Sequence, residues 1–148
     1  MLLASAICSC SEKQPETTEP MITKTEIQVE NGLLTPEIMH RLGKVGDVQV
    51  SPNHAKILYG VSYTSIEQNK GNRELYLMNV DGSENVKITN TPKSESNARW
   101  INDSQIIYMR SGKLYTATIE GSTLKNETEV AGAEGMESFE LSPAGDKI

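Results

Sequence analysis

The chain has 148 residues, of which 36% are hydrophobic and 23% are charged, a balance typical of a globular domain rather than of a disordered or fibrous chain. Its formal net charge is −6 and its lysines and arginines are scattered singly, so no basic stripe is available for a nucleic acid. No apolar run approaches the roughly 18–20 residues that a membrane-spanning helix requires. The composition therefore indicates one compact domain, or part of one.

The first ten residues, MLLASAICSC, combine an apolar run with both cysteines of the chain. Ile7, Cys8, Ser9 and Cys10 resemble the end of a bacterial lipoprotein signal, in which Leu or Ile, two further residues and a lipid-modified Cys follow one another. Cys10 is the candidate for lipid attachment, because Ile7 directly before Cys8 is too bulky for the cleavage position. The stretch lacks the Lys or Arg with which a secretory signal begins, and an apolar tail with two free thiols is the alternative.

Residues 11–32 are expected to form a flexible tether, since residues 11–25 are rich in Glu, Thr and Pro and poor in large apolar side chains. A short helix is predicted next, within TPEIMHRLGKVG. Thr35 can cap its N-terminus, Pro36 suits its first position, and Gly43 can end it in the left-handed conformation. Its apolar side chains fall on one face: Ile38, Met39 and Leu42.

Eight strand-like runs follow, in two sets of four. The first set comprises residues 47–50, 56–64, 73–80 and 85–89, and the second comprises residues 98–101, 105–110, 113–119 and 124–130. Asp81-Gly82 is the strongest turn signal between them, because Gly tolerates the positive φ that hairpins need. Matching Val50 with Ile101 and then with Leu141 gives spacings of 51 and 40 residues, the first being lengthened by an extra loop at 65–72.

A period of ~40–50 residues with four strands in each repeat is typical of β-propeller blades. The middle strands are apolar on both faces, as strands packed between neighbouring blades should be, although a two-sheet sandwich is an alternative. The chain is therefore interpreted as all-β, with about two and a quarter blades of four antiparallel strands after a short helix. Within a partial propeller domain at residues 33–148, blade 1 is expected at about 45–91, blade 2 at about 97–131 and the start of blade 3 at about 138–148.

Several motifs stand in the order found at the start of a known propeller domain. They are Thr35-Pro36-Glu37, Val50-Ser51-Pro52, Leu75-Tyr76, Asp81-Gly82, Lys87-Ile88-Thr89 and Leu141-Ser142-Pro143. Together they resemble the N-terminal propeller of the prolyl oligopeptidase family of serine peptidases, in the branch of the acylaminoacyl-peptidases and dipeptidyl-peptidases. The resemblance covers roughly residues 33–148. Asn53-His54 departs from the Asp-Gly that is usual in the first turn.

The resemblance implies a non-catalytic function for this chain. In that family the propeller is a lid or size filter stacked on an α/β-hydrolase domain that follows in the chain and cleaves short peptides. It implies a truncated, non-catalytic N-terminal part of a secreted serine peptidase, whose partners are that C-terminal hydrolase domain and peptide substrates, with no nucleic acid. With the lipoprotein-like start, it implies the periplasm or outer membrane of a Gram-negative bacterium and a lipid anchor.

No catalytic residue is assigned, because the chain contains no G-x-S-x-G nucleophile elbow, and the nearest approach, residues 60–64, lies inside a predicted strand. His40 falls in the predicted helix and His54 in a turn, without an adjacent nucleophile and carboxylate. No cofactor or metal site is expected. Four glutamates are interpreted as a solvated edge and loop: Glu127, Glu129, Glu134 and Glu137. The aromatic residues are interpreted as core: Trp100 and the tyrosines at 59, 63, 76, 108 and 115.

A propeller of the TolB type, acting as a periplasmic protein-binding module, is the alternative from a different functional class, since such propellers share the Ser-Pro-Asp-Gly turns. A free-standing small β-sandwich is the third interpretation. Sequence beyond Ile148 distinguishes them: further blades followed by a nucleophile elbow indicate the peptidase, and propeller repeats alone indicate the binding module.

Overall fold

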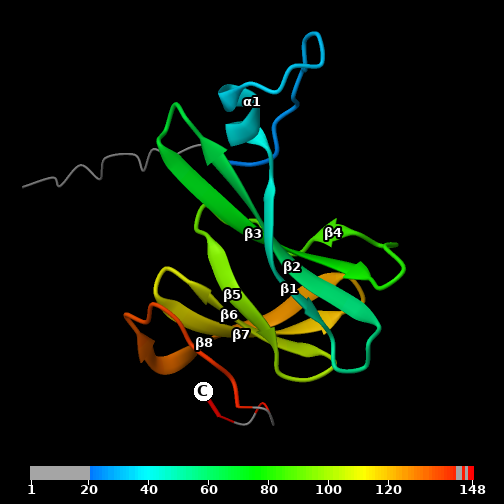
Figure 1. The fold of residues 1–148 in the computed structure, drawn as a ribbon. Helices are drawn as coiled ribbons and strands as arrows, with labels where there is room; N and C mark the ends of the chain where they lie inside the picture. The colour runs from blue at the N-terminus through cyan, green and yellow to red at the C-terminus, as the bar shows by residue number, and fades with distance from the viewer. Residues whose placement is uncertain (1–20, 143–144, 146) are drawn as a thin grey trace, which may run out of the picture.

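The computed structural model describes residues 21–142, 145, 147 and 148 (Figure 1). The candidate lipid site Cys10, the segment 1–10 and the tether up to residue 20 lie outside the described residues. A short helix precedes eight strands: α1 Pro36–Arg41, β1 Lys44–Val50, β2 Lys56–Ser65, β3 Lys70–Asn79, β4 Val86–Lys87, β5 Glu95–Trp100, β6 Gln105–Arg110, β7 Lys113–Glu120 and β8 Thr123–Glu134. In the described part of the chain, no helix has the length and apolar character needed to cross a membrane.

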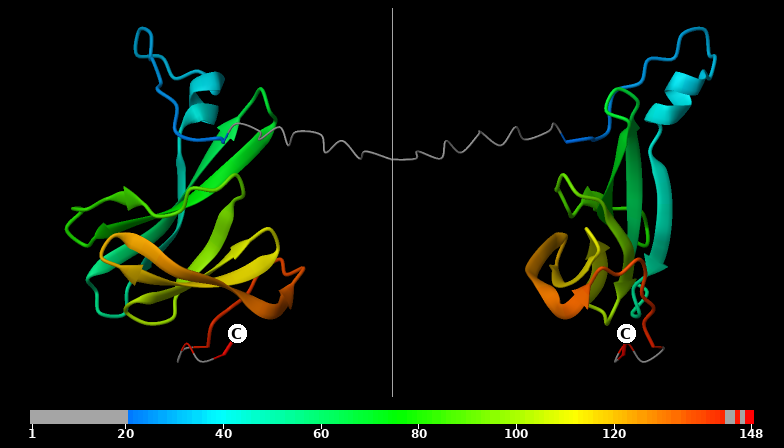
Figure 2. Two further views of the ribbon diagram at one scale, coloured as in Figure 1. Left: turned by 180° about the vertical axis from the view of Figure 1, so that it is seen from behind. Right: turned by 90° about the vertical axis from the view of Figure 1, so that its left-hand side faces the viewer.

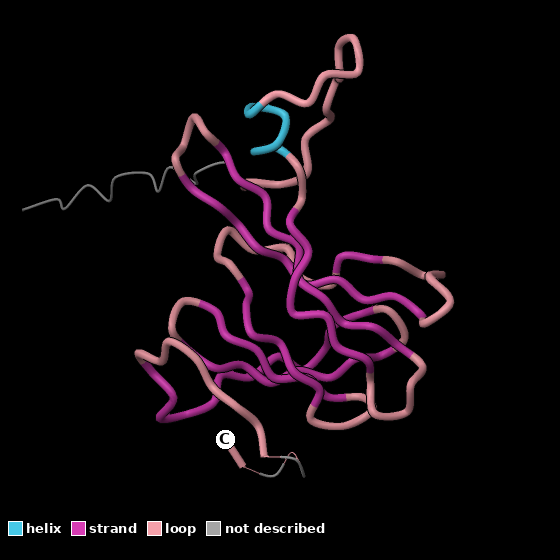
Figure 3. Tube along the Cα trace, in the orientation of Figure 1, coloured by secondary structure: helices cyan, strands magenta, loops and turns pink. Residues whose placement is uncertain are grey.

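The strands form two antiparallel sheets in simple sequence order, β1-β2-β3-β4 and β5-β6-β7-β8 (Figure 3). The sheets pack against each other, and α1 projects at one end of them (Figure 2). The predicted all-β class is confirmed: two successive four-stranded sheets follow one short helix, as in an incomplete propeller-like fold. No closed barrel forms within the described residues.

The core between the sheets draws on the inner face of each. Leu58, Leu75 and Leu77 come from the first sheet, and each is at most 1% exposed. Their partners from the second sheet are Ala98, Trp100, Ile106, Tyr108, Ala117 and Ile119. The other face of the second sheet buries Ile107, Met109 and Leu114 against the segment that follows β8, which contributes Phe139. Strands apolar on both faces are thus covered on both sides in the second sheet.

A bulge recurs at the same place in the first strand of each sheet. Asp47 and Asn97 both adopt the left-handed conformation, with φ of 51° and 53°, where the strand register shifts. The carboxylate of Asp47 accepts a hydrogen bond from the backbone N–H of Asn97 at 3.2 Å. The amide of Asn97 in turn donates to the carbonyl of Phe139 at 3.0 Å. Each bulge residue therefore holds the backbone of the next unit.

The turn after the first strand recurs in the segment that ends the chain. In the first turn, the N–H of Ser51 donates to a carbonyl five residues ahead at 2.8 Å, and His54 donates back to Ser51 at 2.8 Å. In the last turn, Ser142 and Gly145 make the same two bonds at 2.9 and 2.8 Å. His54 and Gly145 share a left-handed φ of 59° and 71°. The last turn thus shares these two hydrogen bonds with the first.

The middle turn shifts the expected alignment by one residue. The N–H of Ile101 donates to the carbonyl of Gln105 at 2.8 Å, as Ser51 does in the first turn. Ile101 therefore corresponds to Ser51, and the counterpart of Val50 is Trp100, one residue before the position that the sequence pattern indicated. The shift arises because this turn is one residue shorter.

The predicted helix forms, but it does not end as expected. The hydroxyl of Thr35 accepts a hydrogen bond from the N–H of Ile38 at 3.3 Å, which confirms the N-cap. Leu42 is extended, with φ −64° and ψ 136°, and Gly43 is not left-handed, so the prediction for Gly43 was wrong. Glycine is needed there for another reason, because a Cβ would lie 2.9 Å from the ring of Tyr63.

The loops gather at two opposite ends of the sheets. The amide of Asn72, near the start of β3, donates to the carbonyl of Thr91 in the crossover between the sheets at 2.9 Å. The N–H of Met136, after β8, donates to Gly112 in the β6–β7 turn at 3.1 Å. The second crossover therefore lies at the β6–β7 turn, and the first lies at the end of the first sheet that holds the β2–β3 hairpin tip and α1 (Figure 1). We call this end of the first sheet the crossover end.

Candidate functional site

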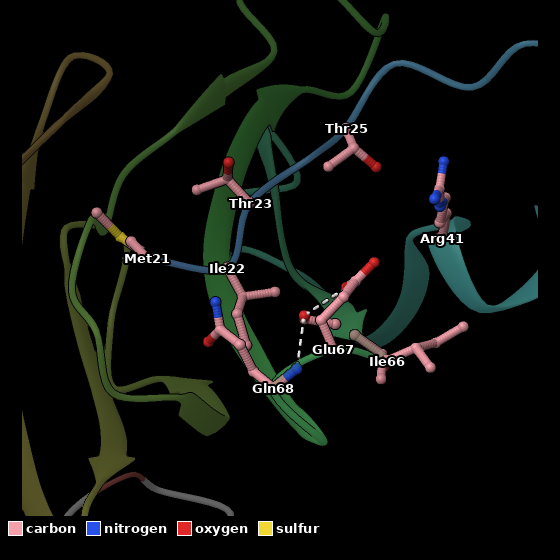
Figure 4. Close-up of a pocket in the computed structure, with 10 residues that line it drawn as sticks. Met21, Ile22, Thr23, Thr25, Arg41, Ile66, Glu67 and Gln68 are labelled. Atoms are coloured by element: carbon pink, nitrogen blue, oxygen red, sulfur yellow. Dashed lines mark hydrogen bonds between the residues drawn. The ribbon is translucent and has the colours of Figure 1, made fainter. Parts of the chain in front are cut away.

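An open pocket lies at the crossover end, between the segment that precedes α1 and the β2–β3 hairpin tip (Figure 4). Its volume is about 300 Å³. Its lining residues are Met21, Ile22, Thr23, Thr25, Arg41, Thr64, Ser65, Ile66, Glu67 and Gln68. Its lining combines hydroxyls, one guanidinium and one carboxylate with the apolar side chains of Met21, Ile22 and Ile66, and it supplies no paired nucleophile and base.

Glu67 is held in place at the rim of this pocket. The hydroxyl of Ser65 donates to its carboxylate at 3.0 Å and accepts from the N–H of Gln68 at 3.2 Å. Hydrogen bonds from its own backbone and from Ser65 lower the pKa of Glu67, with a smaller contribution from the nearby charge of Arg41. Glu67 is therefore ionised at neutral pH, and its charge balances that of Arg41.

A buried polar cluster lies beneath the crossover between the sheets. The carboxylate of Glu74 is 2% exposed. It accepts hydrogen bonds from the hydroxyl of Thr89 at 2.8 Å and from the N–H of Thr91 at 3.2 Å. The amide of Asn72 donates to it at 3.1 Å. Glu74 therefore fastens the crossover onto β3, and both of its carboxylate oxygens accept hydrogen bonds.

A second carboxylate, that of Glu95, is fully buried in the same cluster. One of its oxygens, Oε1, accepts from the hydroxyl of Thr91 at 2.7 Å and lies 3.5 Å from a guanidinium nitrogen of Arg110. Its Oε2 atom has no hydrogen-bond partner among the described residues. Burial raises the pKa of Glu95 to about 7, the hydrogen bond from Thr91 opposes this rise, and the charge of Glu74 adds to it.

The guanidinium of Arg110 joins this cluster to the outer strand β8. It forms an ion pair with Glu127 and lies 4.3 Å from the centre of the Tyr115 ring, while the hydroxyl of Tyr108 donates to Glu127. Burial acts to raise the pKa of Glu127, but the hydrogen bonds from Arg110 and Tyr108 outweigh it and lower that pKa. Glu127 is exposed, as predicted for an edge residue, and it also holds the guanidinium of Arg110 in place.

The geometry favours a structural role for these carboxylates. Paired carboxyl groups can carry out acid–base chemistry when a substrate reaches them, but the side chains of Glu74 and Glu95 are at most 2% exposed. Their neighbours are the hydroxyls and amide that hold the crossover. Among the described residues, no three His, Cys, Asp or Glu side chains are placed to hold a metal ion. The cluster therefore holds the crossover that links the first sheet to the second.

The two histidines lie far from each other in the fold. His40 lies in α1 at the crossover end, and His54 lies in the β1–β2 turn at the opposite end; both are exposed. Residues 60–64 lie inside β2, as predicted. Glu129, Glu134 and Glu137 are exposed. Of the aromatic residues expected in the core, Trp100 and Tyr108 are buried, whereas the tyrosines at 59, 63, 76 and 115 are partly buried.

Two curated proteins are similar to part of this chain. Dipeptidyl-peptidase 5 of Porphyromonas endodontalis is 31% identical over 97 residues, which are 66% of this chain and 13% of that protein. Dipeptidyl-peptidase 5 of Porphyromonas gingivalis is 35% identical over 80 residues, which are 54% of this chain and 12% of that protein. No protein-family model matches. The chain is thus related to peptidases, and it spans only a small fraction of their length.

Proposed function

We propose that this chain is the non-catalytic N-terminal propeller portion of a secreted serine peptidase. Its role is to act as scaffold and substrate-size filter for an α/β-hydrolase domain carried elsewhere in a longer polypeptide. The observation that carries this proposal is the run of two four-stranded sheets in a chain related to dipeptidyl-peptidases 5 over 12–13% of their length.

The repeat geometry supports further blades. The bulge residue of each first strand bonds to the backbone of the segment that follows its sheet, and the turn at Ser142 repeats the hydrogen bonds of the turn at Ser51. A propeller closes with four to eight blades. The continued pattern is what a chain with additional units of the same kind would have.

The uncovered face of the first sheet supports the same proposal. Val45 and Val50 are 63% and 50% exposed, and they pair with Val61 and Ile57 of β2 on the face turned away from the second sheet. The corresponding face of the second sheet is covered by the segment after β8. Covering the valines with another sheet would remove this apolar surface from water, at about 25 cal/mol per Å² buried.

The proposal is tested on the longer protein with a chromogenic dipeptidyl substrate and a serine-reactive fluorophosphonate. We expect hydrolysis, and labelling of a serine outside residues 1–148. A labelled serine within residues 1–148 would refute the non-catalytic role. A longer protein that neither hydrolyses the substrate nor takes up the label would favour the protein-binding propeller of the TolB type.

We further propose that the protein is lipid-anchored through Cys10 in the periplasm of a Gram-negative bacterium. The proposal rests on the lipoprotein-like order of residues 7–10. Cells grown with a radiolabelled fatty acid should label the wild-type protein and the Cys8→Ala variant, and the Cys10→Ala variant should carry no label. Equal labelling of both variants would reject Cys10 as the attachment site.

A further inference from the structure

The hydroxyl of Thr91, in the crossover between the two sheets, lies between two oxygen atoms. Its Oγ1 atom is 2.7 Å from the carbonyl oxygen of Lys93 and 2.7 Å from Oε1 of Glu95. Both distances are those of an O–H···O hydrogen bond. A hydroxyl carries one hydrogen, so Thr91 can donate to one of these two oxygens at a time. The hydrogen of the other bond has to come from the partner.

Glu95 is the partner that can supply this second hydrogen. The carbonyl of Lys93 has none to give, whereas a carboxyl group has one when it is protonated. With Glu95 protonated, Thr91 accepts from Glu95, donates to the carbonyl of Lys93, and also accepts from the N–H of Lys93 at 3.2 Å. The hydrogen and both lone pairs of the hydroxyl are then used. With Glu95 ionised, one of the two 2.7 Å contacts has no hydrogen between its oxygens.

The surroundings of Glu95 also favour its neutral form. The side chain is fully buried, and its Oε2 atom has no hydrogen-bond partner among the described residues. An unpaired buried oxygen costs less free energy in a neutral carboxyl group than in an anion. Arg110 lies 3.5 Å from Oε1, beyond the usual N–H···O distance, and is ion-paired with Glu127.

The charged and titratable groups that face Glu95 come from three strands. They are Glu74 of β3, Tyr108 and Arg110 of β6, and Glu127 of β8, which acts through Arg110. Glu74 accepts hydrogen bonds from three donors, as an anion does, and burial raises the pKa of Tyr108, so that this hydroxyl stays neutral. Ionising Glu95 would place a second negative charge beside Glu74, and burial raises the pKa of Glu95 to about 7.

We propose that a proton on Glu95 holds the crossover between the sheets closed, and that loss of this proton to water loosens it. In the closed state, hydrogen bonds run from Glu95 to Thr91 and from Thr91 to the carbonyl of Lys93. When the O–H bond of Glu95 breaks, the hydroxyl of Thr91 turns to the carboxylate and releases that carbonyl. A surface groove of about 420 Å³, lined partly by Thr91 and Arg110, gives water access to this side of the cluster.

The test uses the full natural polypeptide and measures the proton and the opening separately. Infrared difference spectra between the wild type and the Glu95→Gln variant detect the proton. At pH about 6 we expect the C=O stretch of a neutral carboxyl group in the wild type, and we expect it to disappear as the pH rises through about 7. Absence of this band at pH about 6 would overturn the proposal.

Amide exchange of residues 89–95, corrected for the intrinsic effect of pH on exchange, measures the opening. Because the folded pKa is the higher one, the contribution of the proton is fully present below pH about 4.5 and is lost as the pH rises through about 7. We expect wild-type opening to increase at least about tenfold between pH about 5 and about 7. The Glu95→Gln variant, which keeps a donor, should show no such rise, and the exposed Glu129→Gln control should follow the wild type.

Two variants of Thr91 test the role of its hydroxyl. Thr91→Val should open the crossover even at pH about 5, and Thr91→Ser, which keeps the hydroxyl, should exchange as slowly as the wild type. Equal opening in the Val and Ser variants would show that the methyl group of Thr91 holds the crossover. That outcome, or a wild-type pH dependence retained in Glu95→Gln, would overturn the proposal.

Discussion

Replacing Glu95 by Gln should remove a large part of the dependence of stability on pH. The Glu95 side chain is fully buried, and burial raises its pKa from 4.5 to about 7 in the folded protein. In the unfolded chain the group returns to its ordinary pKa. Because the folded pKa is the higher one, Glu95 contributes stability that is fully present below pH about 4.5 and is lost as the pH rises through about 7.

The size of this effect follows from the difference between the two pKa values. A difference of about 2.5 pKa units corresponds to about 3 kcal/mol of unfolding free energy, since each unit is worth about 1.4 kcal/mol. The origin is structural: ionising Glu95 places a charge in a buried cluster that already contains Glu74, with one oxygen unpaired. Gln has nearly the same shape and does not ionise.

Urea unfolding at a series of pH values measures this effect. Trp100 is the single tryptophan of the chain and is 8% exposed, so its fluorescence reports on the core. We expect the wild-type unfolding free energy to fall between pH about 4.5 and about 7, relative to that of the Glu95→Gln variant. Glu129→Gln is the control, because hydrogen bonding to Lys113 lowers the pKa of Glu129 and moves its titration below this range. Parallel wild-type and Glu95→Gln curves would refute the reasoning.

Two further substitutions test the packing and the helix cap. Gly60→Ala should lower the unfolding free energy by about 2 kcal/mol, because its Cβ would lie 2.3 Å from Nε of Arg73 and force that side chain off its 2.8 Å ion pair with Asp47. Gly71→Ala, whose nearest neighbour is 3.4 Å away, should change it by less than about 0.5 kcal/mol in the same urea assay; equal effects would contradict the clash. Thr35→Ala should destabilise α1 by about 1 kcal/mol and speed its amide exchange without moving the global unfolding midpoint, since no residue of α1 is buried. A large shift in that midpoint would show that α1 is part of the core.

The strands could be predicted because their apolar pattern is local, and the differences arise where pairing depends on something else. The polar stretch at 65–72 was expected to be a loop, yet β2 and β3 pair as far as Ser65 and Lys70, because a polar hairpin extension has no apolar alternation to reveal it. The run at 85–89 was expected to be a whole strand. β4 is shorter, since the hydroxyl of Thr89, and not its backbone, accepts from the N–H of Leu75.

The buried polar cluster could not be predicted, because its contacts join residues far apart in sequence. Glu74 reads as one polar position in a strand, and only the fold brings Thr89 and Thr91 to it. Glu127 is exposed, as its place in an outer strand predicts, but the strand pattern does not predict its partner. A register shift in β8 next to the left-handed Asn126 accompanies its contact with Arg110. The alternation along a strand predicts on which face of the sheet a residue lies, but it does not predict the contacts that arise at a bulge.

The two bulges show why equivalent positions carry different residues. Both need a short polar side chain that tolerates positive φ and reaches the next unit, which Asp47 and Asn97 do. In the first sheet, Gly60 leaves space opposite the bulge and Arg73 fills it, so the bulge residue must also neutralise a guanidinium. In the second sheet, Met109 stands at the place of Gly60 and brings no charge. A carboxylate is therefore required at the first bulge, whereas an amide suffices at the second.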